Sequence, residues 1–322
     1  MREPRLETLQ AGGLRMQVAI QGSGPLVLLC HGFPELWSSW RAQLTALAAA
    51  GRRAVAPDMR GYGGTDAPAA IDQYTMLHLV GDVVGLVRAL GETRAVVVGH
   101  DWGAVVAWHA ALLRPDIFRG VVGMSVPFAP PGRMDLLAAL RSQGIDDFYM
   151  QYFQQPGVAE AELERDVAAT LRLVTFNGSG DGPGRAAFGR LEPGGGLLDG
   201  MVEPDALPAW LDADSLEACA VEFRHTGFRG ALNWYRNFTR SRELLAPWRG
   251  AVIRQPSLFI AGTRDSVLRF PGSQTQIDNF GRTLPGLRGC HLLDGAGHWI
   301  QRERSAEVNG LLVDFLKGLP AV

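Results

Sequence analysis

The chain has 322 residues, a formal net charge of −2, 47% hydrophobic residues and 20% charged residues, which is an ordinary balance for a globular protein. No basic stripe stands out, so nucleic acid is not expected as a partner. No apolar run approaches the roughly 18 residues of a membrane span, so membrane insertion is not expected. The length suits one large domain, or a core that carries a sizeable insertion.

Strands and helices alternate over the first 125 residues. The pattern predicts strands at 15–20, 25–30, 53–57, 94–98 and 119–125, and helices at 37–50, 73–91 and 102–113. The apolar runs Leu26–Leu29 and Val96–Val98 are typical of parallel strands that are buried on both faces. This alternation predicts an α/β fold with a mostly parallel central sheet.

The pattern changes after Pro127. Pro130-Pro131-Gly132 predicts a boundary, and residues from about 132 to 247 have helical patterns. The glycine-rich segment 178–200 predicts a mobile loop, not a packed element. Strands return at 257–262 and 289–293, and a helix over about 303–317 follows. We therefore predict a core of residues 1–130 and 248–322 that is interrupted by a helical cap, residues 131–247.

The three cysteines, Cys30, Cys219 and Cys290, are widely spaced and show no metal-binding pattern. A set of reduced thiols is expected, with Cys30 and Cys290 buried because they lie in apolar runs. The N-terminal residues mix both charge signs and lack the apolar core of a signal peptide. We expect a cytoplasmic protein with no metal and no cofactor, either a monomer or a homodimer.

An aspartate stands in a turn that usually presents a serine. Residues 94–103 read Arg-Ala-Val-Val-Val-Gly-His-Asp-Trp-Gly, a strand, a sharp glycine-flanked turn and the start of a helix, which is the pattern of a nucleophile elbow. The presented residue is Asp101. A carboxylate is a weak acyl nucleophile, but it can displace a leaving group from an sp³ carbon and form an ester. Asp101 therefore favours epoxides or alkyl halides over esters and amides.

Two further residues complete a catalytic set. Asp265 follows the strand at 257–262, and His298 lies in a glycine-rich loop after the strand at 289–293. The chain order of nucleophile, acid and histidine is typical of α/β-hydrolases. Such residues gather at the carboxyl edge of the sheet. We predict that His298 is a general base and that Asp265 orients it.

Backbone donors are expected beside Asp101. The loop His31-Gly32-Phe33-Pro34 follows a strand, where such folds place one donor of the oxyanion hole. The donors would be the N–H groups of Phe33 and Trp102. We expect His31 to be structural and His100 to help hold the elbow.

Five segments together resemble epoxide hydrolases of the α/β-hydrolase fold. They are His31–Trp37, Gly99–Gly103 and Gly297–Trp299 in the core, and Tyr149–Glu160 and Gly227–Asn237 in the insert. The resemblance covers nearly the whole chain. The insert segments are its most specific part, because dehalogenases and esterases share the core motifs.

The resemblance implies conversion of a small-molecule epoxide to a vicinal diol through an aspartyl ester, with no cofactor. It also implies a cap with two tyrosines that hold the epoxide oxygen, here Tyr149 and Tyr235. A tyrosine stays protonated at neutral pH and can protonate the alkoxide that forms on ring opening. Tyr152 competes with Tyr149, since residues three apart on a helix face similarly.

The substrate pocket is expected to be apolar and aromatic, suited to aryl or alkyl epoxides. The residues predicted to bind substrate are Phe33, Trp37, Trp102, Phe128, Tyr152, Val267 and Trp299.

The main alternative is a haloalkane dehalogenase, which uses the same Asp–His–Asp machinery. Dehalogenases commonly carry asparagine where this chain has Phe33, and paired cap tyrosines favour the epoxide. A non-catalytic binding protein is disfavoured because Asp101, Asp265 and His298 are all present. An esterase would need a serine at position 101.

Overall fold

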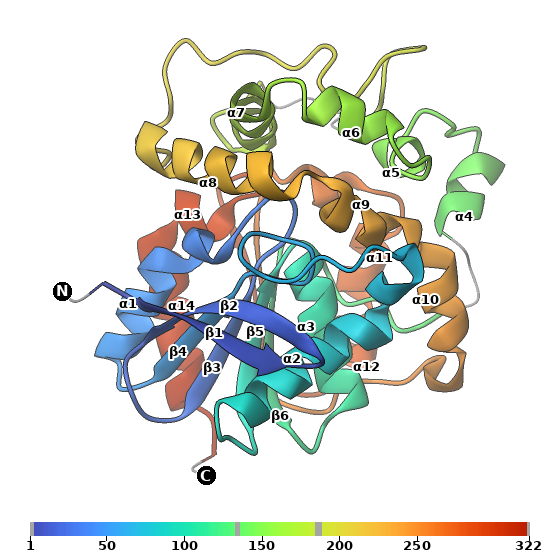
Figure 1. Cartoon of the computed structure of the whole chain (residues 1–322). Helices are drawn as coiled ribbons and strands as arrows, with labels where there is room; N and C mark the ends of the chain where they lie inside the picture. The colour runs from blue at the N-terminus through green and yellow to red at the C-terminus, as the bar shows by residue number, and fades with distance from the viewer. Residues whose placement is uncertain (1–2, 133–135, 184–188, 321–322) are drawn as a thin grey trace.

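The computed structural model describes residues 3–132, 136–183 and 189–320. Within these residues, the centre of the molecule is an eight-stranded sheet of order β1-β2-β4-β3-β5-β6-β7-β8 (Figure 1). The strands are β1 Arg5–Ala11, β2 Leu14–Gln21, β3 Leu26–Cys30, β4 Arg53–Pro57, β5 Ala95–His100, β6 Phe118–Met124, β7 Ser257–Gly262 and β8 Leu287–Leu293. From β4 to β8 all neighbours are parallel, whereas β1 and β2, and β2 and β4, pair antiparallel.

Helices cover both faces of the sheet. They are α1 Arg41–Ala49, α2 Met76–Ala89, α3 Trp102–Leu113, α11 Ser273–Asp278, α12 Phe280–Thr283, α13 Ile300–Glu303 and α14 Ser305–Lys317. Short 3₁₀ helices lie at η1 Trp37–Trp40, η2 Ile71–Tyr74, η3 Ala246–Trp248 and η4 Ser266–Arg269.

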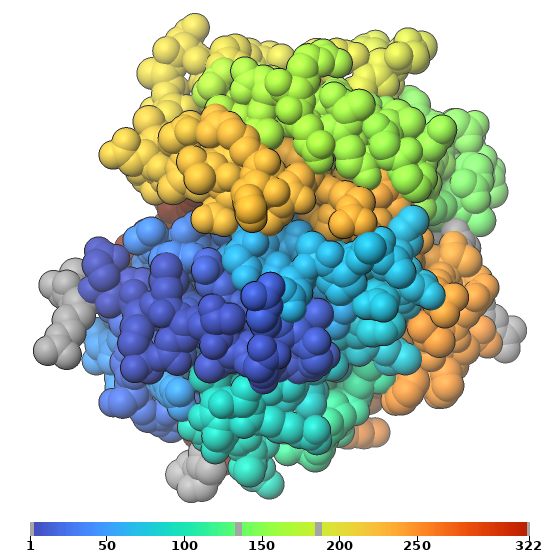
Figure 2. All heavy atoms as spheres, viewed as in Figure 1, coloured from blue at the N-terminus to red at the C-terminus, as the bar shows by residue number. Residues whose placement is uncertain are grey.

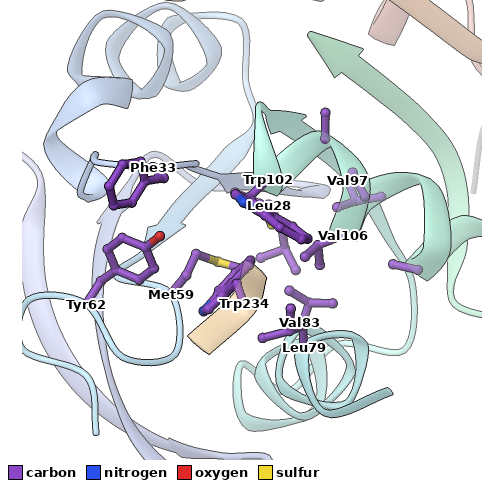
Figure 3. Close-up of a cluster of buried hydrophobic side chains, with 14 of the residues drawn as sticks. Leu28, Phe33, Met59, Tyr62, Leu79, Val83, Val97, Trp102, Val106 and Trp234 are labelled. Carbon is purple, nitrogen blue, oxygen red and sulfur yellow. The ribbon is translucent and has the colours of Figure 1, made fainter. Parts of the chain in front are cut away.

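The alternation of side chains along β5 explains the two layers of core. Val96 and Val98 pack in the cluster that contains Leu44 of α1 and Leu312 of α14. Val97 points to the other face and packs in the cluster that contains Val83 of α2 and Val106 of α3 (Figure 3). Burial of both faces accounts for the continuous apolar run in the sequence.

A helical layer, the cap, lies over the carboxyl ends of the parallel strands, and its last helix, α10, runs down the side of the core (Figures 1 and 2). We define it as helices α4 Leu136–Ser142, α5 Tyr149–Tyr152, α6 Val158–Leu163, α7 Val167–Gly178, α8 Ala213–Thr226, α9 Arg229–Arg236 and α10 Phe238–Leu244, with their connections. All of them fall in the chain between β6 and β7, which are adjacent and parallel in the sheet. The predicted α/β fold with an inserted helical layer is confirmed.

Two differences from the predictions lie at the two edges of the sheet. Strand β1 was not predicted, because this edge strand is mostly exposed and carries few apolar residues. Cys290 is exposed, so the prediction that it is buried was wrong. It lies on β8, the opposite edge strand, where alternate residues face solvent. In the part of the chain that the structure describes, no helix combines the length and apolar character needed to cross a membrane.

Candidate active site

Asp101 lies at a strained turn between β5 and α3. Its φ of 52° is in the left-handed region, which is rare for residues other than glycine and typical of functional turns. The residues that flank this turn, Gly99 and Gly103, must be glycine because other backbone atoms lie where a side chain would be. A Cβ atom at Gly103 would lie 2.0 Å from the carbonyl oxygen of Cys30, and one at Gly99 would lie 1.9 Å from that of Gly103. The sharp turn that these glycines allow directs the Asp101 carboxylate into a cavity.

Two backbone N–H groups point at this carboxylate. The N–H of Phe33, in the loop after β3, donates to Asp101 Oδ1 over 2.8 Å, and the N–H of Trp102 also hydrogen-bonds the carboxylate. The peptide bond between Phe33 and Pro34 is cis. The structure thus brings both N–H groups that were predicted as oxyanion donors to the Asp101 carboxylate.

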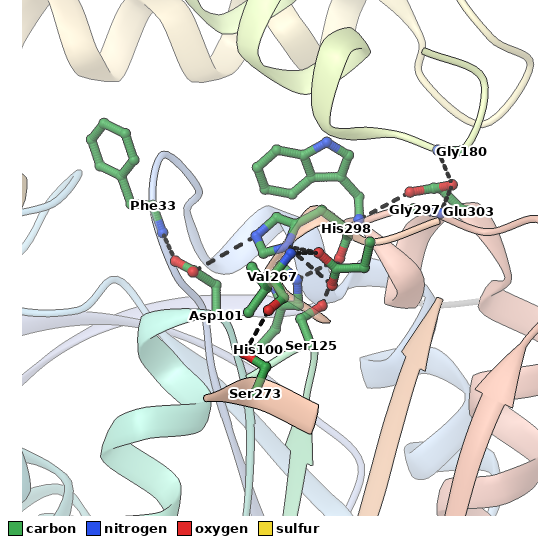
Figure 4. Close-up of polar contacts among 12 residues, drawn as sticks. Phe33, His100, Asp101, Ser125, Gly180, Val267, Ser273, Gly297, His298 and Glu303 are labelled. Carbon is green, nitrogen blue, oxygen red and sulfur yellow. Dashed lines mark hydrogen bonds and ion pairs between the residues drawn. The ribbon is translucent and has the colours of Figure 1, made fainter. Parts of the chain in front are cut away.

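His298 lies beside Asp101 (Figure 4) and also contacts a second acidic residue, Asp265. Its Nε2 is 3.7 Å from Asp101 Oδ2, and its Nδ1 is 3.1 Å from Asp265 Oδ1 and 3.3 Å from Oδ2. Asp265 is fully buried, and its Oδ1 also accepts the N–H of Val267, so it caps η4 while it orients the histidine. This is the geometry of a nucleophile, a base and an orienting acid.

Burial and charge shift the pKa values of this set. Burial alone would lower the pKa of His298, but the charge of Asp265, its hydrogen bond and the charge of Asp101 raise that pKa to about 9. Burial raises the pKa of Asp101, against the opposing charge of His298. Burial also acts to raise the pKa of Asp265, but the charge and hydrogen bond of His298 bring it below the usual value. The resting site therefore favours an imidazolium at His298 beside the Asp265 carboxylate.

Glu35, for which the sequence analysis gave no role, supports the loops around the site. Its Oε2 is 2.7 Å from His100 Nδ1, and His100 Nε2 is 2.7 Å from the carbonyl oxygen of His298. Glu35 Oε1 accepts from Gln301 Nε2 at 2.9 Å. Burial would raise the pKa of Glu35, but the charge and hydrogen bond of His100 lower it to about 2. His100 thus holds the His298 loop as well as the elbow. The other structural histidine, His31, accepts the N–H of Met59 at 2.9 Å through Nε2.

Two tyrosines of the cap lie across the cavity from Asp101. Tyr149 on α5 and Tyr235 on α9 have ring centroids 5.9 Å apart, and their hydroxyl groups hydrogen-bond each other. Burial, with the charge of Asp101 as a further cause, raises both pKa values well above 10. The Tyr152 hydroxyl instead donates to Glu162 Oε2 over 3.0 Å, and Tyr152 does not line the cavity.

Comparison with known proteins places this geometry in a family. A model of the α/β hydrolase fold matches residues 25–172. "Epoxide hydrolase A" of Mycobacterium tuberculosis is 46% identical over 99% of each chain, and "Epoxide hydrolase" of Caballeronia sordidicola is 44% identical over 98% of this chain and 94% of its own. The structure of an epoxide hydrolase from an endophytic Streptomyces superposes with a TM-score of 0.93, at 48% identity over 98% of this chain and 95% of the other.

The chain belongs to the epoxide hydrolase family. The full-length match to several members of this family does not favour the dehalogenase alternative.

The cavity of this epoxide hydrolase family member is small, with a volume of about 40 Å³. It is lined by Phe33, Asp101, Tyr149, Val174, Leu197, Tyr235, Ser266, Val267, Phe270, His298 and Trp299. Phe33, Val267 and Trp299 therefore line it as predicted. Val174, Leu197, Ser266 and Phe270 were missed. The last two follow Asp265 closely in the chain, a signal that was overlooked, whereas nothing in the sequence marked Val174 or Leu197.

The other four residues predicted to bind substrate are not among those that line this cavity. Trp37 lies under the Arg41 guanidinium at 4.7 Å. Phe128 packs on Trp108, with ring centroids 5.8 Å apart. The Trp102 ring stacks on Phe238 and also meets the ring of Tyr235 edge-on, both with centroids 5.1 Å apart, so it packs behind a cavity residue and does not line the cavity itself. Tyr152 is bonded to Glu162, as described above.

The glycine-rich segment 178–200 was predicted as an unpacked loop, but parts of it are packed: residues 178–180 and Leu197 are buried, whereas residues 192–194 are exposed. Glu303 joins this segment to the catalytic loop (Figure 4). Its carboxylate accepts the N–H groups of Gly180 and Gly297 at 2.8 Å each, and that of Trp299 at 2.9 Å. The His298 N–H donates to the carbonyl of Gly178 over 2.8 Å. Residues 184–188, which include the predicted loop glycine Gly184, lie outside the described residues.

Proposed function

We propose that this chain hydrolyses a small-molecule epoxide to a vicinal diol, with Asp101 as the nucleophile. The observation that carries the proposal is the position of the Tyr149 and Tyr235 hydroxyls in the same cavity as the Asp101 carboxylate. A halide leaving group needs hydrogen-bond donors but no proton, whereas an epoxide oxygen leaves as an alkoxide that must be protonated. Two protonated hydroxyls opposite a carboxylate therefore provide the acid and the nucleophile that opening of an epoxide needs.

The first step is ring opening. The epoxide oxygen accepts hydrogen bonds from Tyr149 and Tyr235 while an Asp101 oxygen attacks a ring carbon from the other side. The carbon–oxygen bond breaks, a carbon–oxygen bond to Asp101 forms, and the leaving oxygen takes a proton from a tyrosine, which solvent then restores. The raised pKa values of the tyrosines keep both hydroxyls protonated at neutral pH.

The second step is hydrolysis of the ester. Ester formation removes the negative charge of Asp101, one of the causes that raise the pKa of His298, so this pKa falls. The imidazolium then releases its proton to solvent, and the neutral imidazole can act as a base. His298 deprotonates a water that attacks the carbonyl carbon of Asp101. The N–H groups of Phe33 and Trp102 hold the oxyanion, and Asp265 stabilises the imidazolium. The diol leaves with the proton from His298, and the Asp101 carboxyl group then passes its own proton to His298, which restores the imidazolium.

A direct test offers the purified protein styrene oxide and 1-bromobutane in parallel, with assays for diol and for bromide. We expect diol without bromide, and no diol from Asp101→Asn, which keeps the shape of the side chain but loses the anion. Faster release of bromide than of diol would assign the site to dehalogenation.

We propose that the cap is an insertion of residues 131–247 between two core segments, residues 1–130 and 248–322. The adjacency of β6 and β7 supports this division, because the chain leaves the sheet and returns beside the strand it left. We also propose a cytoplasmic location, which the three free cysteines support. Cell fractionation followed by the diol assay tests the location.

A further inference from the structure

Among the described residues, the cap contributes four side chains to the cavity. Tyr149 and Tyr235 belong to the proposed chemistry. The other two, Val174 and Leu197, are apolar and can meet only the body of the substrate. Val174 is fixed on helix α7, whereas Leu197 lies in a segment without helix or strand. The position of Leu197 therefore depends on contacts made by its own segment.

The carboxylate of Glu162, on α6, makes those contacts. Its Oε2 accepts the N–H of Leu197 and its Oε1 that of Leu198, both over 2.9 Å. The neighbouring Gly196 allows this approach, because a Cβ atom there would lie 2.1 Å from Glu162 Oε1. Charge-assisted hydrogen bonds of this kind are stronger than neutral ones.

The far end of the same segment is also anchored. The Asn177 side chain accepts the N–H of Val202 over 2.9 Å and donates to the Val202 carbonyl over 2.8 Å. With both ends fixed, the Leu197 side chain is 6% exposed and directed into the cavity wall. Leu197 is thus a fixed part of the cavity wall.

We propose that Leu197, positioned by Glu162, is a specificity-determining residue that limits the size of the epoxide. The cavity is small, so the Leu197 side chain occupies space that a second bulky substituent would need. The proposal rests on the proposed function, and it names the substrate class as epoxides with one large substituent. Styrene oxide fits this class, and trans-stilbene oxide, with a phenyl group on each ring carbon, does not. Glu162 acts only through Leu197 and is a positioning residue.

The test measures kcat/KM for two substrates. The quantity compared is the value for trans-stilbene oxide divided by the value for styrene oxide. Leu197→Ala should raise this ratio by about 10-fold or more, which is the scale on which apolar pockets discriminate by size. Leu197→Val, a milder change, should raise it less. The matched control is Leu198→Ala, since Leu198 makes the same backbone bond to Glu162 but its side chain does not line the cavity. Its ratio should equal that of the unaltered protein.

A double-mutant cycle tests the positioning role. Glu162→Gln keeps the size of the side chain but replaces one acceptor oxygen with a donor, so it should raise the ratio in the unaltered background. It should have no further effect when Leu197→Ala is already present, because the side chain that Glu162 positions is then gone. An equal effect in both backgrounds would show that Glu162 acts by another route and would overturn its part of the proposal.

A binding measurement separates this proposal from the proposed function. Calorimetry with the two product diols, 1-phenylethane-1,2-diol and 1,2-diphenylethane-1,2-diol, needs no turnover. Leu197→Ala should tighten binding of the diphenyl diol by about 10-fold relative to the monophenyl diol. Failure to form diol from either epoxide would refute the proposed function alone. An unchanged diol preference in Leu197→Ala would overturn the role of Leu197 whatever the turnover assay gives.

Discussion

Three tyrosines of the cap lie near the site, and their hydroxyl partners separate them. Tyr149 and Tyr235 bond each other within the cavity, whereas Tyr152 is bonded to Glu162 outside it. Only a hydroxyl that faces the cavity can donate to an epoxide oxygen. The geometry therefore distinguishes two residues that are three apart on one helical turn and that the sequence left as competitors.

Removal of either cavity hydroxyl should slow ring opening. We expect Tyr149→Phe and Tyr235→Phe each to reduce the rate of alkylation by about 10²-fold, the usual scale for one general acid or oxyanion donor, and the double variant to be slower still. Rapid-quench experiments with enzyme in excess over styrene oxide give this rate. Tyr152→Phe is the control and should change it by only a few-fold. A larger loss in Tyr152→Phe than in Tyr149→Phe would reverse the assignment.

The charge of Asp101 should control the pKa of His298. Asp101→Asn has a neutral side chain of the same shape, like the ester, so one cause of the raised pKa is lost. NMR titration should give a His298 pKa near 9 in the unaltered protein and a clearly lower value in Asp101→Asn. The His298→Gln spectrum identifies the signal. An equal pKa in both proteins would contradict the proposed switch from imidazolium to base.

The meeting of Asp101, His298 and Asp265 could be predicted from sequence because each residue follows a strand in a short motif. The substrate pocket could not, because a ring in the same loop can face the cavity, as Phe33 does, or pack away from it, as Trp37 does. The contact between Glu162 and Leu197 joins residues 35 positions apart, and its only local signal is Gly196. Such contacts depend on tertiary packing, which cannot be predicted from a short sequence motif.

At the scale of elements, close backbone contacts fix how helices lie on the sheet. Gly81 and Gly85 both lie on α2. A Cβ atom at Gly85 would be 2.3 Å from the backbone nitrogen of Gly12, in the turn between β1 and β2, whereas one at Gly81 would meet nothing within 4 Å. The two positions form a matched pair for testing this packing.

Alanine at these positions should have opposite effects on the free energy of unfolding. Gly81→Ala should raise it by about 0.4–1 kcal/mol, because alanine restricts the unfolded chain and favours the helix. Gly85→Ala should lower it by about 1–3 kcal/mol, because the helix must move away from the turn. Urea denaturation measures both. Stabilisation by Gly85→Ala would show that this contact does not restrain the helix.

Strands and helices could be predicted from sequence where both of their faces are buried. The observed bounds of β4 and β7 match the predicted strands at 53–57 and 257–262, and those of α3 match the predicted helix at 102–113. The edge strand β1 was missed because solvent on its exposed side removes the requirement for apolar residues. The packing of the glycine-rich segment was missed because backbone hydrogen bonds to Glu162 and Glu303 hold it, and these leave little hydrophobic pattern.

At the scale of the whole molecule, the site exists only where the cap meets the core. The core supplies Asp101, Asp265, His298 and the backbone donors, and the cap supplies both tyrosines. Glu303 and the hydrogen bond from Trp299 Nε1 to the carbonyl of Thr175, over 2.6 Å, connect the two layers beside His298. This arrangement suits a reaction that needs a nucleophile on one side of the substrate and an acid on the other.

The central claim is that Asp101 forms a covalent ester, and the source of oxygen in the first turnover tests it most directly. A single turnover of styrene oxide is run in ¹⁸O-water with enzyme in excess, and the diol and the Asp101 peptide are analysed by mass spectrometry. Attack by Asp101 transfers a carboxylate oxygen, so we predict unlabelled diol and ¹⁸O in the Asp101 peptide. Fully labelled diol with an unlabelled peptide would show direct attack by water, with Asp101 acting only as a base, and would contradict the mechanism.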